Sequence, residues 1–455
     1  MKYHVPSILC CLIALLTGLY SCKKSFLEKI PDKSLTVPTT LKELQQLLDN
    51  DLIITGNQGI GEVSSDDYYL PLNAWNLQPP EVRNAYLWQK DIFNGSSSND
   101  WNSAYKQVYY ANVVLEQLTN TVLLATDSGS FKTIRGSALL FRGNAFFNLL
   151  QLFAPPYQKD SASALLGIPL RLGSDPSLKV PRSSLADCYS QVMADLNTAS
   201  GLLGTMDKAT PGRPTSASAL GLLGRCQLVM GDYQGALVSA NKALEIQGEL
   251  MDYNSFDSTA LLTFPYPTND EVYYQAYQVT YNLFTYPGSG SIVDSTLLSS
   301  YEPYDLRKTL FFTNINGGVF FKGSYASSYS LFCGPAVDEM FLIRAECNAR
   351  LGNNQGSIDD LNTLRVKRWK TGTYHPLEVS PDALTIVLTE RRKELCFRGL
   401  RWMDLRRLNK DITYQKTLTR IMDGKQYLLV PNDLRYTLPI PDDEIRLNGI
   451  QQNPR

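Results

Sequence analysis

The chain has 455 residues, and its 43 basic and 44 acidic side chains give a formal net charge of -1. Basic residues do not cluster beyond single helix faces, so the sequence indicates no nucleic-acid partner. Only 2 histidines occur, His4 and His375. Because His4 falls in a predicted signal segment, a Ser-His-Asp triad, a Cys-His pair or a zinc site would each depend on His375.

The first residues have the layout of a lipoprotein signal. Lys2 stands before an apolar run from Val5 to Leu19, which is too short to span a bilayer comfortably. Leu19-Tyr-Ser-Cys22 then fits the motif in which a cysteine follows the cleavage site directly and receives the lipid. The alternative interpretation is an ordinary signal peptide in which Cys22 is incidental.

Three segments follow from this interpretation. We predict a signal peptide over residues 1–21, acylation of Cys22, and a polar tether over residues 22–38. No later segment has the roughly 18 consecutive apolar residues of a membrane-spanning helix. Residues 39–455 are therefore predicted to form a single body, which the lipid holds at a membrane.

Apolar residues recur at helical spacing through much of this body, which predicts a mostly α fold. The stretches with this period are Leu41–Leu48, Trp101–Leu118, Ile134–Leu152, Leu185–Leu203, Ser216–Val229, Ala236–Ile246, Met340–Leu351, Ser357–Lys367 and Leu384–Leu408. The third should end before Pro155, because proline cannot donate a helix hydrogen bond and disfavours helix in the residue before it.

Two pairs of these helices have the signature of tetratricopeptide-like hairpins, over about 216–247 and 338–368. In each pair a small residue opens the return helix five positions after a turn glycine, Ala236 after Gly231 and Ser357 after Gly352. Such repeats bury their faces against neighbouring helices, so we expect the other helices to complete the scaffold.

Two segments, about 64–99 and 264–332, are aromatic and rich in loop-forming residues without a sustained helical period. In the second, Val272-Tyr-Tyr and Gly318–Phe321 are candidate short strands. Aromatic rings can lie flat on a sugar, and amide or carboxylate groups can bind its hydroxyls. The candidate ligand-binding residues are Trp75, Asn73, Asn76, Asp67, Tyr69, Tyr86 and Trp88 in the first segment, and Tyr281, Asn282 and Tyr286 in the second.

The ordered set of motifs resembles the SusD/RagB family of Bacteroidetes outer-membrane nutrient-binding lipoproteins, nearly end to end. The most specific pieces are Glu339-Met-Phe-Leu-Ile-Arg-Ala-Glu346 and Glu390-Arg-Arg-Lys-Glu-Leu-Cys-Phe-Arg-Gly-Leu-Arg-Trp-Met-Asp-Leu-Arg-Arg407. The helix from Arg142 to Pro156 and the terminal Gln452-Asn-Pro454 also match. Ala336 and Arg398 depart from the family pattern.

The resemblance implies a SusD-like helical fold, a lipid-anchored position at the outer membrane with the body exposed on the cell surface, and capture of a nutrient. It also implies a SusC-like TonB-dependent transporter as partner. The ligand it implies is a glycan or, in some members, an oligopeptide. It implies no enzymatic activity and no cofactor. Two alternatives of other classes are an α-helical glycoside hydrolase and a lipoprotein that binds only other proteins during assembly.

Glu390 and Glu394 stand one helical turn apart and would suit the carboxylate pair of a glycosidase. Arginines flank both on every side, which should lower the carboxyl pKa, whereas a general acid needs a raised one. We therefore expect ion pairing here. His375 lies in a Gly- and Pro-bounded stretch, which indicates a loop. The sequence thus predicts no catalytic residue and no metal ligand.

Overall fold

The long helices follow from the predicted stretches of helical period. The computed structural model describes residues 38–50, 56–121, 124–205, 212–265 and 269–455. Residues 40–455 form one compact unit in which helices supply most of the regular structure, and this confirms the mostly α fold class. The predicted signal peptide, Cys22 and nearly all of the tether lie outside the described residues.

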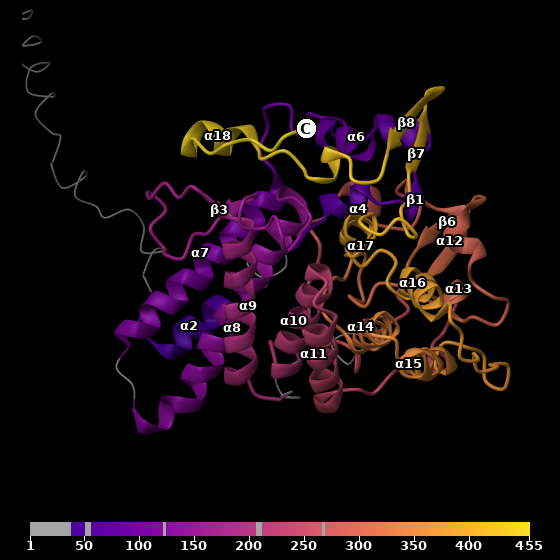
Figure 1. Ribbon diagram of the computed structural model, residues 1–455, viewed down its shortest axis with the longest axis horizontal. Coiled ribbons are helices and arrows are strands. Elements are labelled where there is room, and N and C mark those ends of the chain that lie inside the picture. Colours follow the sequence, from indigo (N-terminus) through magenta and orange to yellow (C-terminus); the bar gives the residue numbers. More distant parts are fainter. Residues whose placement is uncertain (1–37, 51–55, 122–123, 206–211, 266–268) are drawn as a thin grey trace, which may run out of the picture. The chain divides into compact units, whose positions relative to one another are not determined.

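The amino-terminal half is arranged around helix α8 (Ser128–Phe153), whose residues 136–153 are all buried. A helix that is buried on every side is mostly apolar, and its polar groups must find partners inside the protein. Here Asn144 and Asn148 both donate to Asn57 Oδ1. As predicted, it ends just before Pro155. The helices packed around it are α2 (Leu41–Leu48), α7 (Asn99–Asn120) and α9 (Leu185–Leu202) (Figure 1).

Two helical hairpins follow. The first consists of α10 (Ser216–Met230) and α11 (Tyr233–Ile246), and the second of α14 (Val337–Arg350) and α15 (Asn354–Val366). Each turns at a glycine with positive φ, Gly231 at 78° and Gly352 at 84°, which L side chains rarely adopt. Helix α11 packs on α14, so the hairpins lie side by side (Figure 1).

The expected helix Leu384–Leu408 is interrupted. Helix α16 (Ala383–Glu394), which packs on α14 and α15, ends before a turn in which Phe397 and Gly399 have φ of 58° and 70°. Helix α17 (Arg401–Leu408) follows the turn. The periodicity continues across the break because both helices bury apolar residues, so the sequence pattern alone does not reveal it.

The two loop-rich segments contain more regular structure than predicted. Their short helices are α5 (Leu72–Asn76), α6 (Pro80–Tyr86), α12 (Ser295–Ser299) and α13 (Arg307–Leu310), and α4 (Ile60–Ser64) ends where the first segment begins. A last helix, α18 (Asp442–Asn448), stands near the carboxyl terminus. Helices this short bury too few residues for a sustained period to show.

The strands of the described chain form antiparallel pairs. They are β1 (Tyr68–Tyr69) with β4 (Ile292–Val293), β2 (Leu166–Pro169) with β3 (Arg182–Ser184), β5 (Phe312–Ile315) with β6 (Gly318–Phe321), and β7 (Leu418–Met422) with β8 (Lys425–Leu429). The predicted strand Gly318–Phe321 is confirmed as β6. Val272 forms only an isolated bridge with Ala336.

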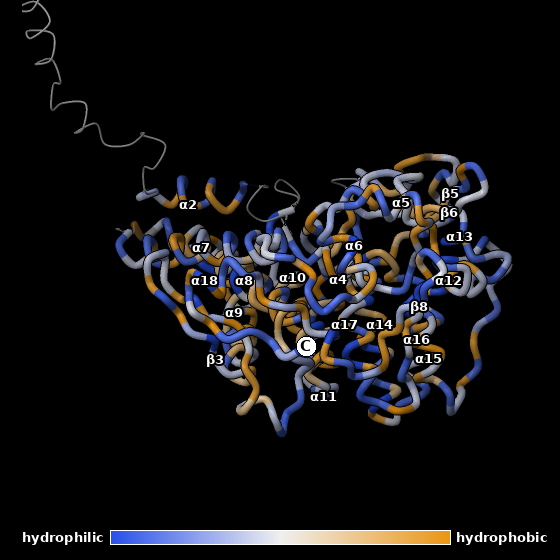
Figure 2. The backbone as a smooth tube through the Cα atoms, turned by 90° about the horizontal axis from the view of Figure 1, so that it is seen from above, coloured by the Kyte–Doolittle hydropathy of each residue, from blue (hydrophilic) through white to orange (hydrophobic). Residues whose placement is uncertain are grey.

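Polar and apolar residues alternate along the backbone, as the mixed blue and orange of Figure 2 shows. Among the described residues, none of the helices has both the length and the apolar character needed to cross a membrane.

Candidate ligand-binding surface

The structure joins the two loop-rich segments at strands β1 and β4. Tyr69 pairs with Ile292 across this two-stranded sheet, although nearly half of the chain separates the two strands in sequence. Next to it, Gly290 has a φ of 123° and lies so close to helix α5 that an added Cβ would be 2.8 Å from the Cβ of Ala74. Only glycine satisfies both conditions. Residues 68–77 and 282–293 therefore share one surface.

Six of the predicted ligand-binding residues are accessible there. Tyr69 is 48% exposed and Tyr286 56% exposed. The others are Asn73, Asn76 and Asn282, which are exposed, and Trp75, which is half-buried. We call these six residues the aromatic surface.

Trp75 is held in place by Arg83 of helix α6. The indole Nε1 donates a hydrogen bond to the carbonyl oxygen of Arg83 at 3.4 Å, and the Arg83 guanidinium lies 5.3 Å from the ring centroid. A cation over an aromatic ring stabilises the ring position. No feature of the local sequence around Arg83 predicts that it contacts Trp75.

The other four predicted residues, Asp67, Tyr86, Trp88 and Tyr281, are all at least 95% buried. Their polar atoms are used inside the protein. Trp88 Nε1 donates to the carbonyl oxygen of Ser64 at 3.0 Å, and the Tyr281 hydroxyl donates to Asp100 Oδ2 at 2.6 Å. In this conformation the four side chains offer no accessible atoms to a ligand, and they support the surface from below.

Arg420 packs beneath the same region. Its guanidinium lies 3.6 Å from the ring centroid of Tyr86 and 4.5 Å from that of Trp88, and it donates to the carbonyl oxygens of Tyr86 and Ser65. This buried arginine fixes the loop between α4 and α6. Because it comes from strand β7, no local sequence signal indicates the contact.

An ion-pair network anchors both halves of the surface to helices α16 and α17. Arg392 Nε donates to Asp67 at 2.9 Å, and Arg392 Nη2 lies 3.4 Å from Asp294, which directly follows β4. Arg401 binds Asp66 with two hydrogen bonds. Burial alone would raise the pKa of Asp66, but Arg401 and Arg392 hold it well below its ordinary value. The position of β1 is thus set by charges from the carboxyl-terminal helices.

The aromatic surface belongs to stretches without charged residues. From Tyr68 to Pro80, and again from Val272 to Val293, the sequence contains no aspartate, glutamate, lysine, arginine or histidine. Exposed rings and amide groups remain as the recognition elements. They suit a ligand that presents hydroxyl groups and apolar C–H faces.

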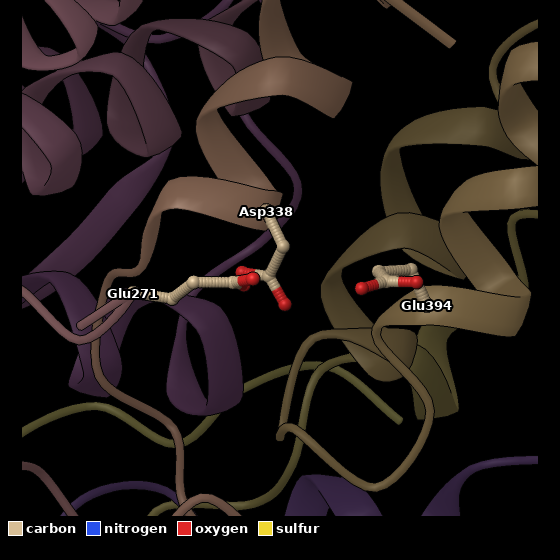
Figure 3. Close-up of side chains that lie close together, drawn as sticks. All are labelled: Glu271, Asp338 and Glu394. Carbon is tan, nitrogen blue, oxygen red and sulfur yellow. The ribbon is translucent and has the colours of Figure 1, made fainter. Parts of the chain in front are cut away.

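A second cluster of polar groups lies in the interior. Carboxylate oxygens of Glu271, Asp338 and Glu394 are all within 4.8 Å of one another, and the three side chains converge from different elements (Figure 3). Arg368 binds both glutamates at 2.7–3.0 Å, and Arg398 binds Asp338 at 3.0 Å. Because each carboxylate already has an arginine partner, the donor set fits a buried ion-pair network better than a cation site.

Glu390 belongs to the same network. Burial would raise its pKa, but Arg307, Lys393 and Arg365 together lower it to about 2. A carboxyl group with this pKa stays ionised and cannot serve as a general acid near neutral pH. The expected ion pairing of Glu390 is therefore confirmed. His375 is exposed.

Comparison with known proteins identifies the family. Residues 25–228 match a family model described as "Starch-binding associating with outer membrane", and residues 338–455 match the model of the SusD family. The chain belongs to the SusD/RagB family. A SusD-like protein P2 of Formosa agariphila is 24% identical over 422 residues, which cover 78% of this chain and 79% of that protein.

Solved structures of SusD proteins have the same fold. A SusD superfamily protein of Bacteroides thetaiotaomicron is similar with a TM-score of 0.71 at 24% identity, covering 91% of this chain and 100% of that one. A SusD-like carbohydrate binding protein of Bacteroides vulgatus is similar with a TM-score of 0.70 at 20% identity, covering 90% and 97%. The predicted SusD-like helical fold is confirmed.

Proposed function

We propose that this SusD-family protein captures a neutral oligosaccharide on the aromatic surface and delivers it to a SusC-like TonB-dependent transporter in the outer membrane. It is anchored through acylated Cys22 and faces outward from the cell. Capture alone needs no chemistry, so the protein is not an enzyme. The family description, which names starch binding and association with the outer membrane, supports sugar capture at that membrane.

The observation that carries the choice of ligand is the combination of exposed rings and amides with the absence of charged residues from the two stretches that supply them. Tyr69, Trp75 and Tyr286 offer apolar faces, and three asparagines offer hydrogen-bond donors and acceptors. A peptide brings charged termini and often charged side chains, which a binding site usually matches with charges of its own. A neutral glycan needs none. The carbohydrate-binding relative from Bacteroides vulgatus agrees with this choice.

Binding titrations test the ligand class. The mature protein is titrated calorimetrically with neutral linear glucans such as maltoheptaose and with other neutral oligosaccharides, and in parallel with mixed oligopeptides of similar mass. We expect affinity for a neutral oligosaccharide and none for the peptides. Affinity for peptides alone would replace the proposal with oligopeptide capture. Shorter sugars found after prolonged incubation would instead indicate a glycoside hydrolase.

The transporter partner needs a separate experiment. The tagged, acylated protein is purified from gently solubilised outer membranes of its source cell, and a Cys22→Ala variant serves as the unanchored control. We expect a large TonB-dependent transporter to copurify with the acylated protein. Recovery of other proteins without any such transporter would favour an assembly role.

A further inference from the structure

Two adjoining cavities lie at the carboxyl ends of helices α8, α10, α14 and α17. Their volumes are about 450 and 170 Å³, and they share Gln158 and Lys410 in their walls. The larger has the size of a small-molecule site. None of the six residues of the aromatic surface lines either one. We call the two together the basic cleft, after the wall residues Arg350, Arg406, Arg407 and Lys410.

The cations of this wall outnumber the anions that they contact. Arg350 and Arg407 share one carboxylate, Glu346, at 2.5–2.8 Å. Arg407 also shares Asp404 with Arg391, at 2.8 and 2.9 Å. Three arginines, of which Arg350 and Arg407 line the cleft, are thus held by two carboxylates, which leaves one excess positive charge beside the wall.

Arg406 and Lys410 add to the excess, because neither forms an ion pair with any residue that the structure describes. The Nη1 and Nη2 atoms of Arg406 donate to the carbonyl oxygens of Leu150, Gln151 and Ala154. These bonds cap the carboxyl end of helix α8. Its Nε atom has no hydrogen-bond partner, although the side chain is only 3% exposed and lines the smaller cavity. A buried donor without a partner is costly, so the described residues do not fully satisfy this guanidinium.

Lys410 is an exposed residue, and among the described residues its only hydrogen bond goes to the carbonyl oxygen of Tyr157. Partial burial of its amino group together with the charges of Arg406 and Arg407 lowers the pKa of Lys410 to about 8. The remaining charged side chains at the cleft are Lys159, Asp160 and Asp411 at the larger cavity and Asp433 at the smaller one. Asp433 is already paired with Arg435 at 2.7 Å, and none of the four forms an ion pair with Lys410. Lys410 therefore has no counter-charge in direct contact among the described residues.

We propose that the basic cleft is a second binding site, which takes a sugar-sized molecule bearing an oxyanion, with its carboxylate or phosphate group placed at Lys410. An anion there would supply the missing counter-charge and an acceptor for neighbouring donors. The larger cavity leaves room for a ring beside Tyr157 and Tyr233, both of which line it. The site is distinct in charge from the aromatic surface, so the protein would bind neutral and acidic sugars at different places.

The test is a calorimetric titration of the full mature protein with glucuronate, with inorganic phosphate and with uncharged glucose, at low ionic strength. We expect glucuronate to bind, phosphate to bind more weakly, and glucose to show no binding. Phosphate and glucuronate of equal affinity would mean that the site takes a free oxyanion, which overturns the sugar-sized part of the proposal. If neither anion binds at concentrations up to about 10 mM, the proposal of a second site is overturned. Binding weaker than this would contribute less than about 3 kcal/mol.

Two variants locate the binding. Lys410→Gln should weaken glucuronate binding by about tenfold or more, because it removes the unpaired cation. Lys132→Gln, which changes an exposed lysine on helix α8 outside the cleft, should leave it unchanged. Equal loss in both variants would show general charge attraction and contradict the site. Trp75→Ala should leave glucuronate binding intact, because Trp75 lines neither cavity. The proposal of the basic cleft and that of the aromatic surface can therefore fail independently.

Discussion

Arg401 binds Asp66 with two hydrogen bonds, from Nε to Oδ1 at 2.6 Å and from Nη2 to Oδ2 at 2.9 Å, although 335 positions separate them in the chain. The pair joins helix α17 to the residues just before strand β1. It is one reason why the aromatic surface can form at all, since β1 is only two residues long and has few contacts of its own.

Loss of this pair should destabilise the fold. Arg401→Gln leaves Asp66 largely buried with Lys416 and Arg392 as its remaining cationic partners, and we expect the free energy of unfolding to fall by about 2–4 kcal/mol. Urea denaturation measures it. The control is Arg213→Gln, because Arg213 binds Asp49 with the same two-bond geometry but on the surface, where the loss should stay below about 1 kcal/mol. Similar losses in both variants would contradict the argument.

Tyr281 should stabilise the surface without touching the ligand. Tyr281→Phe removes the hydroxyl that donates to the buried carboxylate of Asp100, which should reduce the free energy of unfolding by about 1.5–3 kcal/mol. Oligosaccharide affinity of the folded variant should stay within about twofold of the parent. The matched variant Tyr286→Phe changes an exposed tyrosine and should leave stability within about 0.5 kcal/mol. A large loss of affinity in Tyr281→Phe would return Tyr281 to the ligand contacts.

Glu62 should make stability depend on pH. Burial, reinforced by the nearby charge of Asp67, raises the pKa of Glu62 from 4.5 to about 8. Between these values the folded protein holds a proton that the unfolded chain has released. Stability should therefore fall as pH rises through this window, by up to about 1.4 kcal/mol per pH unit, and this contribution should level off above pH 8.

Glu62→Gln should flatten that dependence. The amide can still accept from the backbone N–H of Gly399 and meet the Ser65 hydroxyl, so the fold should persist. Denaturation midpoints measured from pH 5 to pH 9 give the slope, with the exposed Glu378→Gln as control. Parallel curves for the parent and Glu62→Gln would show that Glu62 is already ionised in the folded state.

The buried carboxylates Glu271, Asp338 and Glu394 should need no cation. Because Arg368 and Arg398 already neutralise them, calcium or a chelator should shift the melting temperature by less than about 1 °C. Differential scanning calorimetry with each addition is the measurement. A drop of several degrees on chelation, restored by calcium, would identify a metal site at this cluster.

Some of this structure follows from local sequence and some does not. Neighbouring residues determine the two helical hairpins that turn at Gly231 and Gly352, through the spacing of apolar residues and the freedom of glycine. They also determine where α8 ends, because Pro155 cannot continue the helix. The turn at Phe397 depends on long-range packing, since the ring stacks on Phe321 at 4.6 Å. Local sequence contains no information about such a partner.

The candidate site divides in the same way. Sequence reasoning selected Tyr69, Trp75 and Tyr286 by residue type, and the structure exposes them to differing extents. It selected Trp88 by the same criterion, yet that side chain is buried beside Arg420. Whether an aromatic side chain in a loop is buried depends on which distant segment covers the loop. Residue type therefore cannot distinguish a buried aromatic residue from an exposed one.

The measurement that tests the central claim most directly is calorimetric titration of a neutral oligosaccharide into matched tyrosine variants. Tyr286 and Tyr304 are 56% and 55% exposed, but only Tyr286 belongs to the aromatic surface. We predict that Tyr286→Ala and Trp75→Ala each lower affinity by about tenfold, or about 1.4 kcal/mol, while Tyr304→Ala binds as the parent does. Equal affinity in all four proteins would contradict capture at this surface.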